Sequence, residues 1–221
     1  MVRRHSRAVF GSALVFPGGA IEPNDHDPTW AQLTRGDVLL GADERALRIG
    51  ALRETWEETS ILLGFAADGA PLQVTERMRG AAFREVVEAT GAMLDLGALQ
   101  PFGHWITPVA EPRRFDTRFY LAAMPPGQVA WSDGAETVGV EWVGPSDAVS
   151  RATDGEQSIL FPTLMNLARL AESSDTGGAI AAAQSRTPYT VEPRIDVRDD
   201  GARVITIPAE AGYAATEYVW K

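Results

Sequence analysis

Apolar and polar positions change their spacing several times along the chain, which predicts a mixture of strands and helices. An apolar run over residues 13–15 leads into Phe16-Pro17-Gly18-Gly19, an order typical of a strand that ends in a tight turn. A helix is predicted over residues 44–59, with Asp43 as the residue that caps its first turn. Residues 114–119 alternate as in a half-buried strand, and a further strand is predicted over residues 138–143.

The last third of the chain has patterns of its own. Residues 157–172 carry apolar side chains at helical spacing, with Pro162 at or before the first turn. After a small polar linker, the alanine-rich residues 179–184 predict a short helix. Two alternating segments then flank Asp199-Asp200-Gly201, which predicts a β-hairpin. We therefore expect a main domain over residues 1–155, with an insertion at about residues 20–43, and a C-terminal extension over residues 156–221 packed on the same domain.

Composition narrows the class of protein without identifying it. With 221 residues, of which 45% are hydrophobic, the chain can bury a full core. It contains no cysteine, which excludes disulfides, thiolate metal sites and a cysteine nucleophile. There is no long apolar stretch and no signal-peptide pattern, so the expectation is a cytoplasmic protein that does not bind membranes. A net charge of −10 argues against a nucleic-acid binder, and any phosphate recognition must come from local arginines and a bound metal.

The predicted helix over residues 44–59 carries the most informative motif, Arg53-Glu54-Thr55-Trp56-Glu57-Glu58. Residues three and four apart are neighbours on a helix, so Glu54, Glu57 and Glu58 converge along one stripe. Carboxylate oxygens of this kind suit a hard cation such as Mg²⁺ or Mn²⁺. A solvated acidic face is the alternative interpretation of the same residues.

Taken with the upstream Pro-Gly-Gly turn, this motif resembles the signature of the Nudix hydrolases, Gly-x5-Glu-x7-Arg-Glu-U-x-Glu-Glu-x-Gly-U, where U is bulky and aliphatic. The matching residues are Gly19, Arg53, Glu54, Glu57, Glu58 and Ile61. Thr55 and Ser60 depart from the signature, and Arg53 lies 53 − 19 = 34 positions after Gly19 instead of 14, so 20 extra residues interrupt it. Counted back from Arg53, the first glutamate of the signature has no clean counterpart, because Arg45 stands there with Glu44 one place away.

Two later segments resemble one branch of the Nudix proteins, which has an interrupted box and includes the peroxisomal coenzyme A diphosphatases. They are His104-Trp105-Ile106-Thr107-Pro108 and Arg113-Arg114-Phe115-Asp116-Thr117-Arg118-Phe119. The resemblance implies an α/β fold, a Nudix-type α/β/α sandwich with a mixed sheet. It also implies metal-dependent hydrolysis of a pyrophosphate bond in a small nucleoside diphosphate derivative, with coenzyme A or acyl-CoA among the candidates. ADP-ribose, ADP-sugars and nucleoside triphosphates stay open as substrates, as does a weakly catalytic ligand-binding or regulatory module.

The same resemblance assigns roles to individual residues. Glu57, Glu58 and the Gly19 carbonyl would hold Mg²⁺ or Mn²⁺, Glu54 would ligate the metal or activate water, and Arg53 would position the glutamates. Glu136 is a candidate second acid, with a solvated loop carboxylate as the equally strong alternative. Candidate contacts to substrate phosphates are Arg113, Arg114 and Arg118.

The arginines have a structural alternative, because Arg114, Asp116 and Arg118 alternate on one strand face and can form an ion-pair network. Trp105 is expected in the core rather than as a ring-stacking residue. Matching proteins carry a strand ahead of the segment at Arg3-Arg4, so we expect the natural chain to begin upstream of Met1. The C-terminal hairpin can supply the contact of a homodimer.

Overall fold

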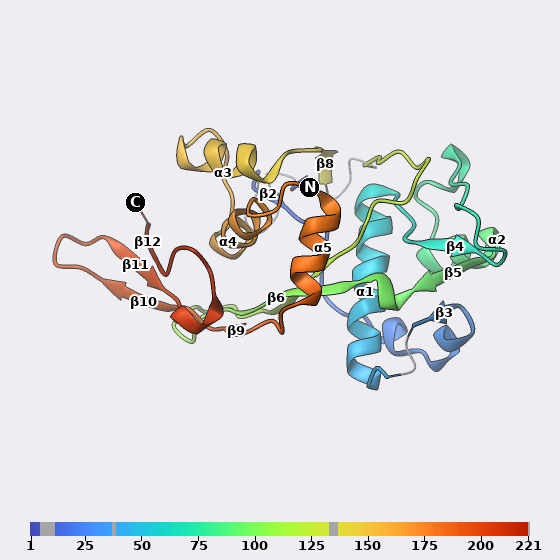
Figure 1. The fold of residues 1–221 in the computed structure, drawn as a ribbon, viewed down its shortest axis with the longest axis horizontal. Coiled ribbons are helices and arrows are strands. Elements are labelled where there is room, and N and C mark those ends of the chain that lie inside the picture. Colours follow the sequence, from blue (N-terminus) through green and yellow to red (C-terminus); the bar gives the residue numbers. More distant parts are fainter. Residues whose placement is uncertain (5–11, 37–38, 133–136, 221) are drawn as a thin grey trace. The chain divides into compact units, whose positions relative to one another are not determined.

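The chain divides into two compact units, each assembled from segments that are separated in the sequence (Figure 1). The computed structural model describes residues 1–4, 12–36, 39–132 and 137–220. Unit 1 comprises Met1–Leu99, Ala122–Val143 and Asp154–Leu160, and unit 2 comprises Gln100–Leu121, Gly144–Thr153 and Phe161–Lys221.

The chain's first strand is the central strand of a sheet in unit 1. β1 (Val2–Arg4) pairs antiparallel with β2 (Leu14–Val15) on one side and with β8 (Thr137–Val140) on the other. Val2 is fully buried and packs with Ala13 and Val15, because alternate side chains of these strands face the same interior. The strand predicted at residues 13–15 is therefore present as β2.

A second sheet of unit 1 is mixed, as predicted. β5 (Ala92–Asp95) runs parallel to β3 (Thr34–Arg35) and antiparallel to β4 (Gly64–Ala66). The helix α2 (Phe83–Thr90) packs on β5 and buries Phe83, Val86 and Val87.

The long helix α1 (Ala42–Thr59) carries the acidic motif and ends where the sequence predicts. It begins two residues earlier than expected: Gly41 occupies the N-cap position, so the prediction of an Asp43 cap is wrong and Asp43 lies in the first turn. Helix α1 buries Ile49, Leu52 and Trp56, and the Trp56 indole nitrogen donates to the Ala81 carbonyl at 2.9 Å. This buried face fixes the rotation of the helix, and the stripe beside it faces the insertion.

The predicted insertion contains two 3₁₀-helices. They are η1 (Pro23–His26) and η2 (Pro28–Gln32), each with proline at its first position. Trp30 is 3% exposed, stacks against Phe83 and donates its indole N–H to the Asn24 carbonyl. Arg84 contacts the Trp30 ring and pairs with Asp27. The insertion is thus anchored to both α1 and α2.

Unit 2 is built around the strand β6 (Gln100–Ile106). It pairs antiparallel with β7 (Asp116–Leu121) and parallel with β9 (Thr190–Val191). Trp105 is 2% exposed and packs with Met165, Val191 and Tyr213, which confirms that it belongs to the core. The helices of unit 2 are α3 (Pro145–Thr153), α4 (Phe161–Leu170) and α5 (Thr176–Gln184).

The predicted C-terminal hairpin is present and gains a third strand. β10 (Arg194–Val197) and β11 (Arg203–Thr206) are antiparallel, and β12 (Glu217–Trp220) pairs with β11, as Figure 1 shows in red. Shorter 3₁₀-helices lie at η3 (Glu76–Met78), η4 (Leu96–Ala98) and η5 (Ala209–Ala211). Among the helices of the described residues, none combines the length and the apolar character that crossing a membrane requires.

Candidate active site

Arg53 lies at the centre of the acidic residues of α1 and is 6% exposed. Its Nη1 donates to Glu54 Oε1 at 2.8 Å and to Glu57 Oε2 at 2.9 Å. Nε and Nη2 donate to the two oxygens of Asp25, each at 3.0 Å, and Nη2 also donates to the Ala20 carbonyl at 2.9 Å. All five guanidinium N–H groups are therefore engaged by the protein.

Asp25 is the residue that sequence reasoning missed. It is 2% exposed in η1, and its Oδ2 also accepts from the Glu22 backbone N–H at 2.9 Å. Gly50 on α1 makes room for it, since a Cβ there would lie 3.0 Å from Asp25 Oδ2. Counted forward from Gly19, Asp25 is the sixth residue, so Gly-x5-acid is intact and the 20 extra residues follow it. The expectation that the first acid lacks a counterpart is wrong because the backward count from Arg53 stops at Arg45 and does not reach across the insertion.

The glycine turn lies directly against the glutamates. A Cβ on Gly19 would lie 2.4 Å from Glu54 Oε1, so any larger residue here would displace the Glu54 carboxylate. The Gly18 N–H donates to Glu58 Oε2 at 3.0 Å, and Glu58 is 7% exposed. One cluster therefore contains the signature residues that are expected from the sequence to lie together, namely Gly19, Arg53, Glu54, Glu57 and Glu58.

The electrostatics of this cluster favour additional positive charge. Arg53 faces three carboxylates within 3.0 Å, those of Asp25, Glu54 and Glu57. Burial raises the pKa of Glu57, and the charges of Glu22 and Asp25 raise it further, although Arg53 opposes both effects. Burial alone would lower the pKa of Arg53, but its hydrogen bonds to Asp25 and Glu54 raise it. A cation bound at Glu57 would therefore relieve charge repulsion that the protein leaves in place.

The donor chemistry of the cluster fits a hard divalent cation, because every candidate ligand is an oxygen. In the described residues, no three acidic or histidine side chains converge closely enough to form a metal-binding group. Glu54 and Glu57 are instead both turned onto Arg53 Nη1. The Glu57 side chain is 44% exposed, so it has space to reorient.

The three candidate substrate-binding arginines belong to unit 2, around the β6–β7 hairpin. Arg114 precedes β7 instead of lying within it, donates to the Thr107 carbonyl and pairs with Glu192 at 2.6 Å. Arg118 pairs with Asp116, and Arg113 stacks on the Phe115 ring. The alternative network therefore exists in part, since Asp116 contacts Arg118 and His104 Nε2, and Arg114 has a different partner.

Glu136 lies outside the described residues. On its two sides, the Trp131 N–H donates to the Thr59 carbonyl at 2.8 Å, and Thr137 Oγ1 donates to the Glu58 carbonyl at 3.5 Å. Both contacts are at the C-terminal end of α1.

Comparison with known proteins supports one family. A family model described as the NUDT19 Nudix domain matches residues 35–170. Acyl-coenzyme A diphosphatase NUDT19 of Gallus gallus is 30% identical over 231 residues, covering 78% of this chain and 61% of the relative. The Xenopus laevis protein of the same name is 26% identical, with 77% and 58% covered. Putative nudix hydrolase 7 of Caenorhabditis elegans is 27% identical, with 93% and 65% covered. The chain thus spans about three fifths of these relatives.

A solved structure agrees with the sequence matches and confirms the predicted α/β fold class. The crystal structure of a NUDIX hydrolase from Alicyclobacillus acidocaldarius superposes with a TM-score of 0.69 at 30% identity, covering 85% of this chain and 87% of that one. The family match includes Arg53, Glu54, Glu57 and Glu58. This chain is a member of the Nudix superfamily and belongs to the NUDT19 Nudix domain family, related to the coenzyme A diphosphatases.

Proposed function

We propose that this protein is a divalent-metal-dependent diphosphatase that hydrolyses the pyrophosphate bond of coenzyme A or of its acyl thioesters. The observation that supports the proposal most is the surplus of carboxylates around Arg53, which holds Glu54 and Glu57 beside the glycine turn. Such an arrangement costs charge repulsion in the absence of a cation, and it stabilises the protein–cation complex once a cation is bound.

In this proposal Glu57, Glu58 and Glu54, with the Gly19 carbonyl, hold Mg²⁺ or Mn²⁺. When bound there, such an ion would supply positive charge to the two phosphoryl groups and lower the pKa of the attacking water. Arg53 keeps Glu54 and Glu57 side by side, and Asp25 keeps Arg53 in place through its two oxygens. Asp25 and Arg53 are thus positioning residues, while the glutamates act at the reaction centre.

Coenzyme A is the favoured substrate because two of the relatives are named acyl-coenzyme A diphosphatases. The box itself specifies how the bond is broken and leaves the rest of the molecule open. ADP-ribose, ADP-sugars and nucleoside triphosphates are therefore the competitors that an assay must include.

The test is product analysis by mass after incubation with Mg²⁺ or Mn²⁺ and a panel of coenzyme A, acetyl-CoA, ADP-ribose, NADH and nucleoside triphosphates. We expect 3′,5′-ADP and the phosphopantetheine half from coenzyme A, with turnover lost in Glu57→Gln and on adding EDTA. Glu85→Gln is the matched control, because Glu85 is an exposed glutamate of α2 outside the cluster. If only another compound of the panel is cleaved, that compound replaces coenzyme A as the proposed substrate. Binding without turnover would indicate a ligand-binding module.

A further inference from the structure

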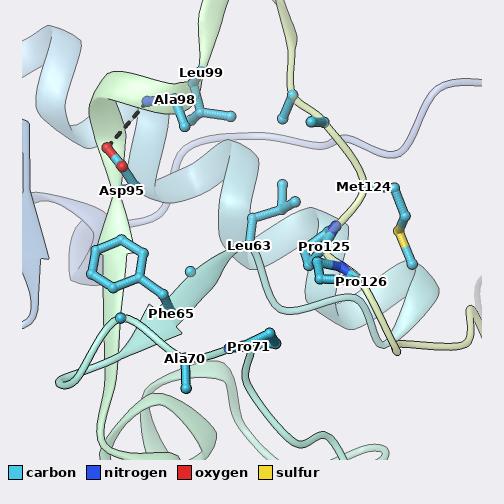
Figure 2. A pocket seen from close by; sticks show the side chains of 14 residues that line it. Leu63, Phe65, Ala70, Pro71, Asp95, Ala98, Leu99, Met124, Pro125 and Pro126 are labelled. Atoms are coloured by element: carbon cyan, nitrogen blue, oxygen red, sulfur yellow. Dashed lines mark hydrogen bonds between the residues drawn. The ribbon is translucent and has the colours of Figure 1, made fainter.

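An open pocket of about 360 Å³ lies in unit 1, beyond the C-terminal end of α1. Figure 2 shows Leu63 between Phe65 and the prolines Pro125 and Pro126, with Leu99 directed into the same space. Small and apolar side chains form most of the remaining wall, including Ala98, Ala123 and Met124. The proposed active site does not use these residues.

The pocket offers little to a charged ligand. Its acidic residue is Asp95, whose Oδ2 pairs with Arg35 at 3.3 Å and whose Oδ1 accepts from the Ala98 N–H at 3.2 Å. Arg35 in turn stacks on the Phe65 ring, 3.2 Å from the ring centre. Proline has no N–H, so Pro125 and Pro126 present no backbone donor. A neutral apolar group suits this lining better than a phosphate or a nucleotide.

Two walls of the pocket are fixed to each other close to the end of α1. The Gln128 side chain donates to the Leu62 carbonyl at 2.9 Å and accepts from the Leu62 N–H at 2.8 Å. This pair ties the segment that carries Pro125 and Pro126 to the residues that follow α1. This contact holds two walls of the pocket together next to the end of α1, the helix that carries Glu57 and Glu58.

The chain limits how far the start of the pocket can lie from the glutamates, and a pantetheine arm can span a distance of that size. Leu63 follows Glu58 by 63 − 58 = 5 residues, so their Cα atoms lie at most about 17 Å apart. The pantetheine arm separates the pyrophosphate from the thioester by a chain comparable to roughly four to five extended residues. A pyrophosphate at Glu57 and Glu58 would thus allow the thioester to reach the pocket.

We propose that this pocket binds the acyl group of a coenzyme A thioester and sets the preference for acyl-chain length. The proposal rests on the function proposed above and names the part of the substrate that distinguishes acyl-CoA from free coenzyme A.

The test measures kcat/KM for coenzyme A and its acetyl, butanoyl, hexanoyl and octanoyl thioesters. We expect kcat/KM to rise about two- to fourfold per methylene until the pocket is full, the upper value corresponding to ~0.8 kcal/mol per buried CH₂. Ala123→Trp fills the pocket and should abolish this rise while leaving free coenzyme A unaffected. Ala89→Trp, at an exposed alanine of α2 outside the pocket, is the control and should keep the rise.

The outcomes separate this inference from the proposed function. Equal kcat/KM for all chain lengths, or an unchanged rise in Ala123→Trp, would overturn the acyl pocket while leaving coenzyme A hydrolysis intact. Absence of turnover would contradict the proposed function, and the pocket would then be tested by calorimetry. Octanoyl-CoA should bind to the Glu57→Gln protein more tightly than coenzyme A does. This difference in affinity should vanish in the double variant Glu57→Gln/Ala123→Trp. Equal affinity of Glu57→Gln for octanoyl-CoA and coenzyme A would overturn the inference. Formation of a dimer in which this pocket is covered by a second copy of the chain would also overturn it.

Discussion

The Arg53 guanidinium is fully occupied by acceptors of the protein and has no N–H left for a substrate phosphate. Its five N–H groups already donate to Asp25, Glu54, Glu57 and the Ala20 carbonyl. A phosphate could engage Arg53 only by displacing a buried ion pair, which is costly. The positive charge that a pyrophosphate requires must therefore come from a metal ion or from other arginines, and Arg53 serves to hold the glutamates.

Glu57→Gln removes the charge of the Glu57 side chain while keeping its size, and its effect on stability should depend on pH. The pKa of Glu57 is raised in the folded protein, mainly by burial. Its contribution to stability is therefore full below its unfolded pKa and decreases as pH rises through the raised folded value. Glutamine never ionises, so in EDTA the melting temperature of Glu57→Gln relative to the wild type should increase between about pH 4 and about pH 8.

Metal addition should favour the wild type over Glu57→Gln. With Mg²⁺ at about 100 times its Kd, the wild type should gain roughly 2.7 kcal/mol of stability, and Glu57→Gln should gain much less. Thermal unfolding in EDTA and in Mg²⁺ measures both effects. A melting-temperature difference that does not rise with pH in EDTA would contradict the raised pKa of Glu57. A variant that keeps the full response to Mg²⁺ would remove Glu57 from the proposed metal site.

Asp25 should matter more for stability than any other acid of the insertion. Asp25→Ala leaves Arg53 Nε and one Nη2 donor without partners in a buried site, which should cost about 3 kcal/mol in the free energy of unfolding. Asp25→Asn keeps one acceptor and should cost less. Asp27→Asn is the control, because the Asp27 side chain is 39% exposed. Denaturant unfolding compares the three, and equal stability of Asp25→Ala and Asp27→Asn would contradict the positioning role.

The contrast between Asp25 and the other motif residues shows what sequence reasoning can reach at this scale. The α1 glutamates and Arg53 are fixed by helical spacing, so their proximity could be predicted. Asp25 contacts Arg53 across 28 positions of chain. Only the forward count from Gly19 provides a signal for it, and the acidic, turn-rich composition of the insertion conceals that signal.

At the scale of elements, the C-terminal end of α1 depends on a residue in a strained conformation. Ser60 ends the helix with φ of 54° and ψ of 25°, the left-handed conformation in which glycine is preferred. It is 3% exposed and its N–H donates to the Trp56 carbonyl at 2.7 Å. The cost of this conformation is small enough for serine to be tolerated, and the turn directs Ile61 and Leu62 into the core.

The residue at position 60 should therefore set the stability of the protein, which we expect to be highest with glycine, intermediate with the natural Ser60 and lowest with valine. Glycine removes about 1–2 kcal/mol of left-handed strain and loses about 0.5–1 kcal/mol of chain entropy, a net gain of roughly 0.5 kcal/mol. Valine is β-branched and should be the least stable. Chemical denaturation of the three proteins measures the order, and a valine variant as stable as the serine protein would contradict the strained turn.

Elements with a strong local pattern could be predicted, and those defined by partners could not. The C-terminal hairpin is predicted from the alternation around Asp199-Asp200-Gly201. The prediction for α1 gives its last residue correctly and its first residue to within two positions. β12 has no such local signal, because it exists through pairing with β11. The 3₁₀-helices of the insertion depend on Trp30 packing against Phe83, a contact that a polar, proline-rich sequence does not indicate.

At the scale of the whole molecule, the two kinds of candidate site residue lie in different units. The carboxylate cluster belongs to unit 1, and Arg113, Arg114 and Arg118 belong to unit 2. Their contributions can therefore be separated by experiment. A change at an arginine should leave the stabilisation by Mg²⁺ intact, whereas a change at Glu57 should not.

Arg118→Ala tests whether a unit 2 arginine contacts substrate or only completes a surface network. Arg118 pairs with Asp116, and the two side chains are 33% and 51% exposed. An exposed ion pair contributes roughly 0–1 kcal/mol, so the melting temperature should change little. A lost arginine–phosphate contact is worth about 1.5–3 kcal/mol, which predicts a fall in kcat/KM of about tenfold or more, with Mg²⁺ stabilisation unchanged. Arg198→Ala is the control, since Arg198 forms a similar surface pair with Glu217 in the C-terminal sheet, with side chains that are 49% and 53% exposed. If both variants keep wild-type kinetics, Arg118 serves the network with Asp116 and His104, and phosphate recognition must be assigned to other residues.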